Sequence, residues 1–285
     1  MIRLGNIDFS NCYPIHAPLL GSAAPDWLRV VDGPPSELNR RLAAGELDVA
    51  PGSSIELARH HREYSALGGL CIGSDGPVDS IILVSSRPLG ELHGLPVALP
   101  TVSATSRCLA RILLETRLGV VPQWVDFDQS RGHPLRPQGP QEGSRGRVGS
   151  GERAPVAALF IGDAALRLPI REDEMRYDLG SEWKSWTGLP FMFALWRVRD
   201  EAATSRGMQA LHRVLVEQRD ALPAAYGDLA APASARYGVP AERLRRYWRH
   251  IRYSLDGHML SGFRRFLELA ADIGEAPPDA AIRWL

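Results

Sequence analysis

The chain has 285 residues, 45% of them hydrophobic, and its 33 basic and 33 acidic residues give a formal net charge of zero. This length predicts either two domains or one large α/β unit with a substantial core. A neutral chain lacks the basic excess that nucleic-acid binding usually requires, so we expect a small molecule, and no nucleic acid, as its partner.

The amino terminus and the cysteines indicate a soluble protein of the cytoplasm. "MIRLGNIDFS" lacks a secretory signal, and no run approaches the roughly 20 apolar residues of a membrane span. Cys12, Cys71 and Cys108 are far apart and show no CxxC or Cys/His zinc spacing. We expect reduced thiols, no metal and no membrane contact, and the sequence leaves monomer and homodimer open.

Short apolar runs alternate with helical patterns along the chain, which predicts an α/β fold. The predicted strands are IRLGNIDF, LRVVDG, LDVAPG, SIILVSS, LPVALP, PQWVDF, VAALFIG and FMFALWRV. Helices are expected between them. One has Ser36 as candidate N-cap and Gly45 as stop, a second opens with Ser53 and Glu56 in a capping box, and a third ends at Gly119.

Two later segments have a distinct composition. Residues 129–154 are rich in Gly, Pro, Arg and Gln and nearly devoid of apolar side chains, so we expect a disordered surface insertion there. The last third of the chain is predicted to be helical. In "ERLRRYWRHIRYSL" an apolar stripe runs from Leu244 to Leu255, with most arginines on the other face.

Polar residues follow three predicted strands where helices begin, in "LDVAPGSSIEL", "VALPTVSATSRCL" and "ALFIGDAAL". Helix N-termini expose unpaired N–H groups that bind phosphate or carboxylate. The candidate hydroxyl donors are Ser53, Ser54, Ser103, Thr105 and Ser106. Simple helix capping is the commoner role for any one of them, but two hydroxylated helix starts favour an anion site. Asp163 either caps its helix or faces a ligand.

The stretch "FSNCYPI" offers two further candidates. Cys12 resembles a nucleophile with His16 as its base, but Pro14 between them argues against a shared helical face. Asn11 both donates and accepts hydrogen bonds, and it lies in a loop after a strand, where α/β proteins bind ligands. Asn11 is the better candidate. The absence of HExxH, P-loop and GxGxxG motifs predicts no cofactor.

Seven fragments in order resemble the chorismate dehydratase family of the futalosine route to menaquinone. They are "FSNCYPI", "ELDVAPGSSIELAR", "IGSDGPVDSIILVS", "LPTVSATSRCLARILL", "ALFIGDAAL", "YDLGSEWKSWTGLPFMFALW" and the helical tail. The likeness spans nearly the whole chain. Cys12 departs from the residue common in that family, which argues further against a catalytic thiol, and the insertion at 129–154 is a second departure.

The resemblance implies a two-lobed fold like that of type II periplasmic binding proteins, with the ligand in the cleft. The first lobe would comprise residues 1–86 and 195–285, and the second lobe residues 87–194. The segments SIILVSS and FMFALWRV would cross between the lobes as a hinge.

The resemblance also implies the reaction, which removes water from the dicarboxylate chorismate to give 3-[(1-carboxyvinyl)oxy]benzoate. Asn11, Ser53 and Ser54 would line one wall of the cleft. The other wall would carry Ser103, Ala104, Thr105, Ser106 and Asp163. Asn11 is the expected catalytic residue, and the base is either the substrate's enolpyruvyl carboxylate or Asp163.

Two other functions remain open at this point. A protein of this fold can bind a small anion without chemistry. The related naphthoate-forming enzyme of the same pathway is understood to use a histidine base in its second lobe. The only histidine between Gly94 and Pro190 is His133, inside the insertion, which argues against that enzyme.

Overall fold

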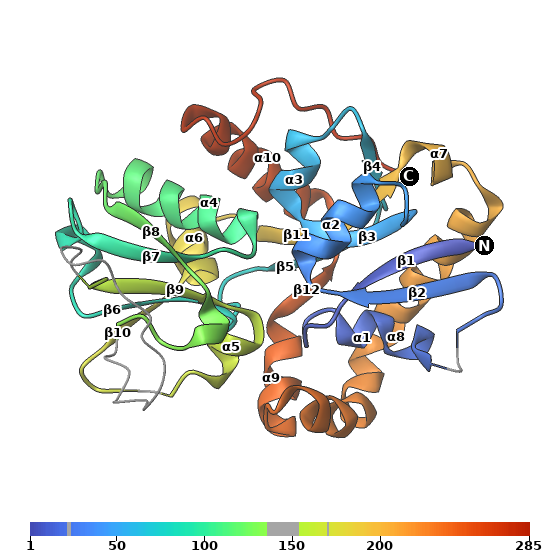
Figure 1. The fold of residues 1–285 in the computed structure, drawn as a ribbon, viewed down its shortest axis with the longest axis horizontal. Helices are drawn as coiled ribbons and strands as arrows, with labels where there is room; N and C mark the ends of the chain where they lie inside the picture. The colour runs from blue at the N-terminus through green and yellow to red at the C-terminus, as the bar shows by residue number, and fades with distance from the viewer. Residues whose placement is uncertain (22–23, 136–153, 170) are drawn as a thin grey trace, which may run out of the picture.

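The computed structural model describes residues 1–21, 24–135, 154–169 and 171–285. Its strands form two sheets that lie side by side (Figure 1). The seven-stranded sheet has the order β12-β5-β11-β3-β1-β2, with β4 paired to β11, and the five-stranded sheet has the order β10-β6-β9-β7-β8. We call the first sheet with α1–α3 the first lobe and the second sheet with α4–α6 the second lobe.

All eight predicted strands are present, and the described residues contain four further short strands that were not predicted. The first sheet contains β1 (Ile2–Ile7), β2 (Leu28–Gly33), β3 (Val49–Ser53), β4 (Tyr64–Ala66), β5 (Leu70–Ser74), β11 (Phe191–Arg199) and β12 (Ile251–Ser254). The second sheet contains β6 (Ile81–Ser85), β7 (Pro96–Pro100), β8 (Gln123–Phe127), β9 (Ala157–Ile161) and β10 (Met175–Asp178). β1 runs parallel to β2 and β3, and β7 runs parallel to β8 and β9.

Helices cover the sheets and form the carboxyl-terminal third (Figure 1). They are α1 (Tyr13–His16), α2 (Pro35–Ala43), α3 (Ser54–Arg59), α4 (Ala104–Arg111), α5 (Gly162–Arg167), α6 (Leu179–Thr187), α7 (Asp200–Ala203), α8 (Arg206–Tyr237), α9 (Ala241–His250) and α10 (Gly257–Asp272). A π-helical segment, Ile112–Arg117, continues α4. Two helix ends differ from the prediction. Pro34, not Ser36, is the N-cap of α2, and the stripe expected up to Leu255 breaks after His250, because β12 pairs with β5.

The chain changes sheet at residues 75–80 and again at 188–190, after α6. The prediction that SIILVSS and FMFALWRV cross between lobes is wrong, because β6 lies wholly in the second sheet and β11 wholly in the first. The carboxylate of Asp178 accepts hydrogen bonds from the amides of Val78 (3.0 Å), Asp79 (2.7 Å) and Ser181 (3.0 Å). One side chain therefore fixes the first crossing and caps α6. The lobe boundaries near residues 86 and 195 stay a prediction.

A chain of hydrogen-bonded polar side chains runs from the core of the first lobe to the exposed Asp32. The indole of Trp196 donates to His16 Nε2 (2.9 Å), His16 Nδ1 lies 2.7 Å from Asn6 Oδ1, and Asn6 Nδ2 donates to Asp32 (2.6 Å). Because an indole only donates, Nε2 of His16 is the acceptor and Nδ1 carries the proton. Burial lowers the pKa of His16 to about 4. This neutral histidine has both nitrogens engaged and does not act as a base for Cys12.

Part of the expected insertion at 129–154 is described. Gln129–Arg131 form a 3₁₀ turn, and the side-chain amide of Gln129 pairs with the backbone of Ile161 at 3.1 and 3.3 Å. Its start is therefore tied to β9, while residues 136–153 lie outside the described part of the chain. Among the helices of the described residues, none combines the length and apolar character needed to span a bilayer.

Candidate functional site

A cavity of about 570 Å³ lies between the lobes, at the carboxyl ends of β1, β2, β7 and β8. Phe9 and Pro34 line it from the first lobe, and Thr101 and Gln129 line it from the second. Carboxyl ends of parallel strands are the usual ligand position in α/β folds, and small-molecule pockets measure roughly 300–1,000 Å³. This cavity is therefore the candidate ligand cleft.

The lining of the cavity contains several acidic residues. Asp8, Asp32, Glu37 and Asp128 contribute to its lining. Asp8 accepts hydrogen bonds from Arg236 (2.7 Å) and Tyr237 (2.9 Å), and Asp32 accepts from Asn6. Since like charges repel, a ligand's carboxylates fit poorly beside these residues. None of the predicted site residues lines this cavity, although Phe9 and Val102 do, close in sequence to Asn11 and to the start of α4.

The predicted hydroxyls of the two walls meet directly. Thr105 Oγ1, on α4, accepts a hydrogen bond from the Ile55 amide of α3 (3.1 Å) and lies 3.2 Å from Ser54 Oγ. Ser54 Oγ also donates to the Met192 carbonyl (2.7 Å). Thr105 and Ser54 are fully buried. The start of α3 thus lies against the start of α4 across the lobe interface.

The capping box predicted at Ser53 is wrong. Ser53 is the N-cap residue of α3, but its side chain makes no capping hydrogen bond. The acceptor for the amide of Ile55 comes from Thr105, a residue of the other lobe. A helix end that is capped in this way is complete only when the two lobes are in contact.

Ser103, Ala104 and Ser106 form the start of α4. Ser103 has a left-handed backbone (φ 63°, ψ 79°), and its hydroxyl lies 2.8 Å from that of Ser106. Ser106 is buried, and Ala104 and Ser103 are half-buried. A non-glycine residue at positive φ costs conformational energy and is found disproportionately at ligand sites. The strained start of α4 supports its assignment to the site.

Asp163, on α5, joins the second lobe to the loop after β1. Its carboxylate accepts hydrogen bonds from the backbone amide and the hydroxyl of Ser10, and both residues are buried. Burial raises the pKa of Asp163, and the bonds from Ser10 partly oppose the shift. The indole of Trp248 donates to the carbonyl of Ser10 (2.8 Å). Asp163 therefore directly contacts the residue that precedes Asn11.

Asn11 has a fixed backbone and an unused side-chain oxygen. Tyr253 donates its hydroxyl to the carbonyl of Asn11 (2.8 Å), while Asn11 Oδ1 is buried without a hydrogen-bond partner among the described residues. Buried polar atoms are nearly always paired, and an exception calls for an explanation such as a ligand. The next residue, Cys12, is buried, which raises the pKa of its thiol to about 12. Of these two residues, the asparagine is the one available for function.

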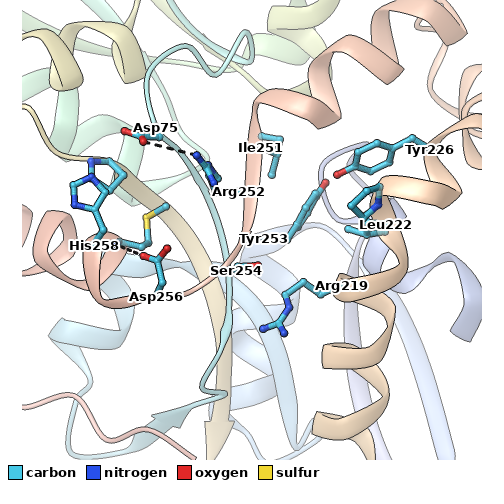
Figure 2. Close-up of a pocket in the computed structure, with 13 residues that line it drawn as sticks. Asp75, Arg219, Leu222, Tyr226, Ile251, Arg252, Tyr253, Ser254, Asp256 and His258 are labelled. Atoms are coloured by element: carbon cyan, nitrogen blue, oxygen red, sulfur yellow. Dashed lines mark hydrogen bonds and ion pairs between the residues drawn. The ribbon is translucent and has the colours of Figure 1, made fainter.

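A smaller cavity of about 200 Å³ lies between α8, β12 and the start of α10 (Figure 2). Asp75 and Pro190, from the two crossings, also line it. Asp75 pairs with Lys184 at 2.5 Å and lies 3.9 Å from Arg252. Tyr253 belongs to the lining, so this cavity adjoins the residue whose hydroxyl holds Asn11. None of the predicted site residues lines it.

Sequence reasoning missed Ser10, Trp248 and Tyr253. Ser10 was visible as a polar residue beside Asn11, but its partner Asp163 is 153 positions away. Trp248 and Tyr253 were assigned to one amphipathic helix, and nothing local indicates that they reach the loop after β1. Among the described residues, no group of three or more His, Cys, Asp or Glu side chains is arranged to hold a metal.

The chain is similar to proteins of known kind over nearly its whole length. The model of the menaquinone biosynthesis family matches residues 2–272. The chorismate dehydratase of Thermus thermophilus is 30% identical over 268 residues, which cover 93% of each chain.

Two solved structures share the fold. A protein of Archaeoglobus fulgidus superposes with a TM-score of 0.71 at 17% identity, covering 96% of this chain and 97% of that one. The alkanesulfonate-binding protein of Xanthomonas axonopodis pv. citri, bound to MOPS, gives a TM-score of 0.66 at 14% identity, with 97% and 94% covered. These likenesses confirm the predicted two-lobed, periplasmic-binding-protein-like fold.

Proposed function

The chain belongs to the menaquinone biosynthesis family, and we propose that it is a chorismate dehydratase acting in the cytoplasm, in the futalosine route. It removes water from chorismate to give 3-[(1-carboxyvinyl)oxy]benzoate. The observation that carries the proposal is the 30% identity to a chorismate dehydratase over 93% of both chains. An alignment of that extent includes most of both lobes.

The two carboxylates of chorismate match a site built from helix starts. The α4 start, Ser103 to Ser106, binds one carboxylate, and Ser53 and Ser54 bind the other. These hydroxyls lie within hydrogen-bond distance of each other, Ser54 of Thr105 and Ser103 of Ser106. Because hydroxyl hydrogens rotate freely, the same groups can turn toward a carboxylate.

The chemistry follows from the substrate. The proton on ring carbon 3 is acidified by conjugation to the ring carboxylate, so its loss gives a dienolate. The dienolate expels the hydroxyl on carbon 4, and the aromatic ring that forms drives the reaction. The protein holds the reactive conformer and stabilises the charge that develops on the ring carboxylate.

We assign the remaining steps to Asn11 and Asp163. The unpaired Oδ1 and the amide of Asn11 hydrogen-bond near the departing hydroxyl or the proton in flight. The proton goes to the substrate's enolpyruvyl carboxylate or to Asp163. The raised pKa of Asp163, which comes from its burial, makes that carboxylate a stronger base. Its bond to Ser10 keeps it beside the Asn11 loop.

The likeness to an alkanesulfonate-binding protein favours a second candidate, a small-anion binding protein without catalysis. To test this, the purified protein is incubated with chorismate, without metal or nucleotide. The products are separated by chromatography and their masses are measured by mass spectrometry. A dehydratase yields an aromatic species lighter by one water, whereas a binding protein returns chorismate unchanged.

The naphthoate-forming alternative has no support in the cavity, since His133 packs on Phe160 (ring centroids 4.6 Å apart) and is not among the lining residues.

A further inference from the structure

Outside the cleft, one carboxylate bridges the two lobes. Glu275, in the tail after α10, accepts a hydrogen bond from Arg59 of α3 on one oxygen and from Arg111 of α4 on the other. Arg59 Nε also donates to the backbone carbonyl of Glu275 (2.8 Å). α3 and α4 are the two helices whose N-termini meet at Ser54 and Thr105. A single residue therefore holds both helices that build the candidate anion site.

The sequence around Glu275 fixes its position. α10 ends at Asp272, and Gly274 takes the left-handed backbone (φ 74°) that ends many helices. The amides of Gly274 and Glu275 then bond back to Ala271 (2.9 Å) and Ala270 (2.7 Å). This turn places the Glu275 side chain reproducibly, with little conformational entropy left to lose when it pairs.

α10 is itself anchored to the second crossing. A Cβ built on Gly262 would lie 1.9 Å from the Pro190 carbonyl, so the helix packs backbone to backbone on that segment. Only glycine permits this approach. α10 is thus fixed to the hinge in its amino-terminal half, and Glu275 follows its carboxyl end, where it meets one arginine from each lobe.

The two arginines are held in place by further contacts. Arg59 pairs with Glu56 (2.7 Å), and Arg111 pairs with Glu115 (2.9 Å), which also accepts from the indole of Trp124 (2.8 Å). The side chains of Arg59, Arg111 and Glu275 are 31%, 28% and 22% exposed. Because these side chains are partly exposed to solvent, added salt can screen the attraction between their charges.

We propose that Glu275 is a positioning residue that holds the lobes closed by pairing with Arg59 and Arg111 together. In the closed form Thr105 caps α3, so Glu275 sets the fraction of molecules in which the two helix starts face a ligand together. A ligand that binds only this form loses apparent affinity in proportion to the closed fraction. The catalytic consequence rests on the proposed function, but the effect on closure does not.

Hydrogen exchange in the ligand-free full chain tests closure directly. The Ile55 amide has no acceptor within its own helix and bonds only across the interface, to Thr105. Glu275→Gln should speed its exchange roughly threefold to tenfold, while the Ala58 amide inside α3 keeps its rate. Glu268→Gln, which removes an exposed pair with Arg265 on α10, is the matched control and should change neither rate.

Salt and a second variant sharpen the test. About 0.5 M NaCl should speed Ile55 exchange in the wild type and leave Glu275→Gln unchanged. Arg111→Gln should reproduce the effect, and the double variant should exceed neither single one. Wild-type exchange at Ile55 in Glu275→Gln, or additive effects in the double variant, would overturn the proposal.

Kinetics supply the catalytic consequence. With chorismate, Glu275→Gln should raise KM by the factor by which the closed fraction falls, and leave kcat within about twofold. A fall in kcat without a rise in KM would contradict a positioning role. If chorismate is not consumed at all while Ile55 exchange still responds to Glu275→Gln, the dehydratase fails and the closure device stands.

Discussion

Thr105 of the second lobe caps the first lobe's helix α3, accepting a hydrogen bond from the amide of Ile55 at 3.1 Å. The bond joins the lobes at their buried interface, as does the bond that the Ser10 amide donates to Asp163. Replacing the cap should therefore affect both the stability of the closed form and the binding of substrate.

Thr105→Val keeps the shape of the side chain and removes its oxygen. The buried Ile55 amide then lacks a partner, which should cost about 1–2 kcal/mol of unfolding free energy and raise KM. Thr105→Ser, which retains the hydroxyl, is the control and should lose less than half as much. Urea denaturation with chorismate kinetics measures both, and wild-type stability in Thr105→Val would show that the bond contributes nothing.

Asn11→Ala should lower kcat far more than it weakens the binding of chorismate. Removing one preorganised hydrogen-bonding group from a developing charge typically costs about 10²-fold in kcat. The backbone contact between Tyr253 and the Asn11 carbonyl survives the change, so the loop should keep its place. Steady-state kinetics decide the matter, and an unchanged kcat would remove Asn11 from the mechanism.

Cys12→Ala should leave kcat near the wild-type value. Its thiol is buried and has a pKa raised to about 12, so it is neither ionised nor reachable at neutral pH. Cys71 and Cys108 are buried as well. A thiol-specific colorimetric reagent should accordingly label the native chain slowly and the urea-unfolded chain at all three cysteines. Rapid labelling of the native protein together with loss of activity would instead support Cys12 as a catalytic nucleophile.

Buried His16 should make the fold sensitive to acid. Its folded pKa of about 4 lies below the ordinary 6.5, so the unfolded chain binds the proton more tightly. Above pH 6.5 His16 is neutral in both the folded and the unfolded state, so it causes no loss of stability. As the pH falls from 6.5 to 4, stability should drop by up to about 3 kcal/mol from this residue.

The variant His16→Gln isolates that contribution. Glutamine can accept from Trp196 and donate to Asn6 without gaining a proton. Its unfolding free energy, measured by urea titration across the same pH range, should be lower than wild type at neutral pH and decline less on acidification. Parallel pH curves for the two proteins would show that His16 is not the titrating group.

Local patterns in the sequence predicted most strands and the polar residues after them. They failed where a partner lies far along the chain. The capping box at Ser53 is a rule about neighbours, but α3 is capped by Thr105, 50 positions away. The apolar stripe after Leu244 has helical spacing throughout, yet pairing with β5 makes Ile251–Ser254 a strand.

The crossing segments show the same limit. SIILVSS reads as a strand and is one, but only its pairing with β9 and β10 assigns it to the second sheet. Asn11 was recognisable as a candidate because loops at the carboxyl ends of strands are where most α/β folds bind their ligands. Tyr253, which fixes the backbone of Asn11, is 242 positions away and had no local signal.

The most direct test of the account is a proton NMR time course of chorismate with the wild-type chain, without added metal or nucleotide. The dehydratase predicts that the ring signals of chorismate at carbons 3 and 4 disappear while aromatic signals with an intact enolpyruvyl group grow in equal proportion. Unchanged chorismate, in a sample that binds it saturably, would contradict the dehydratase and establish a binding protein.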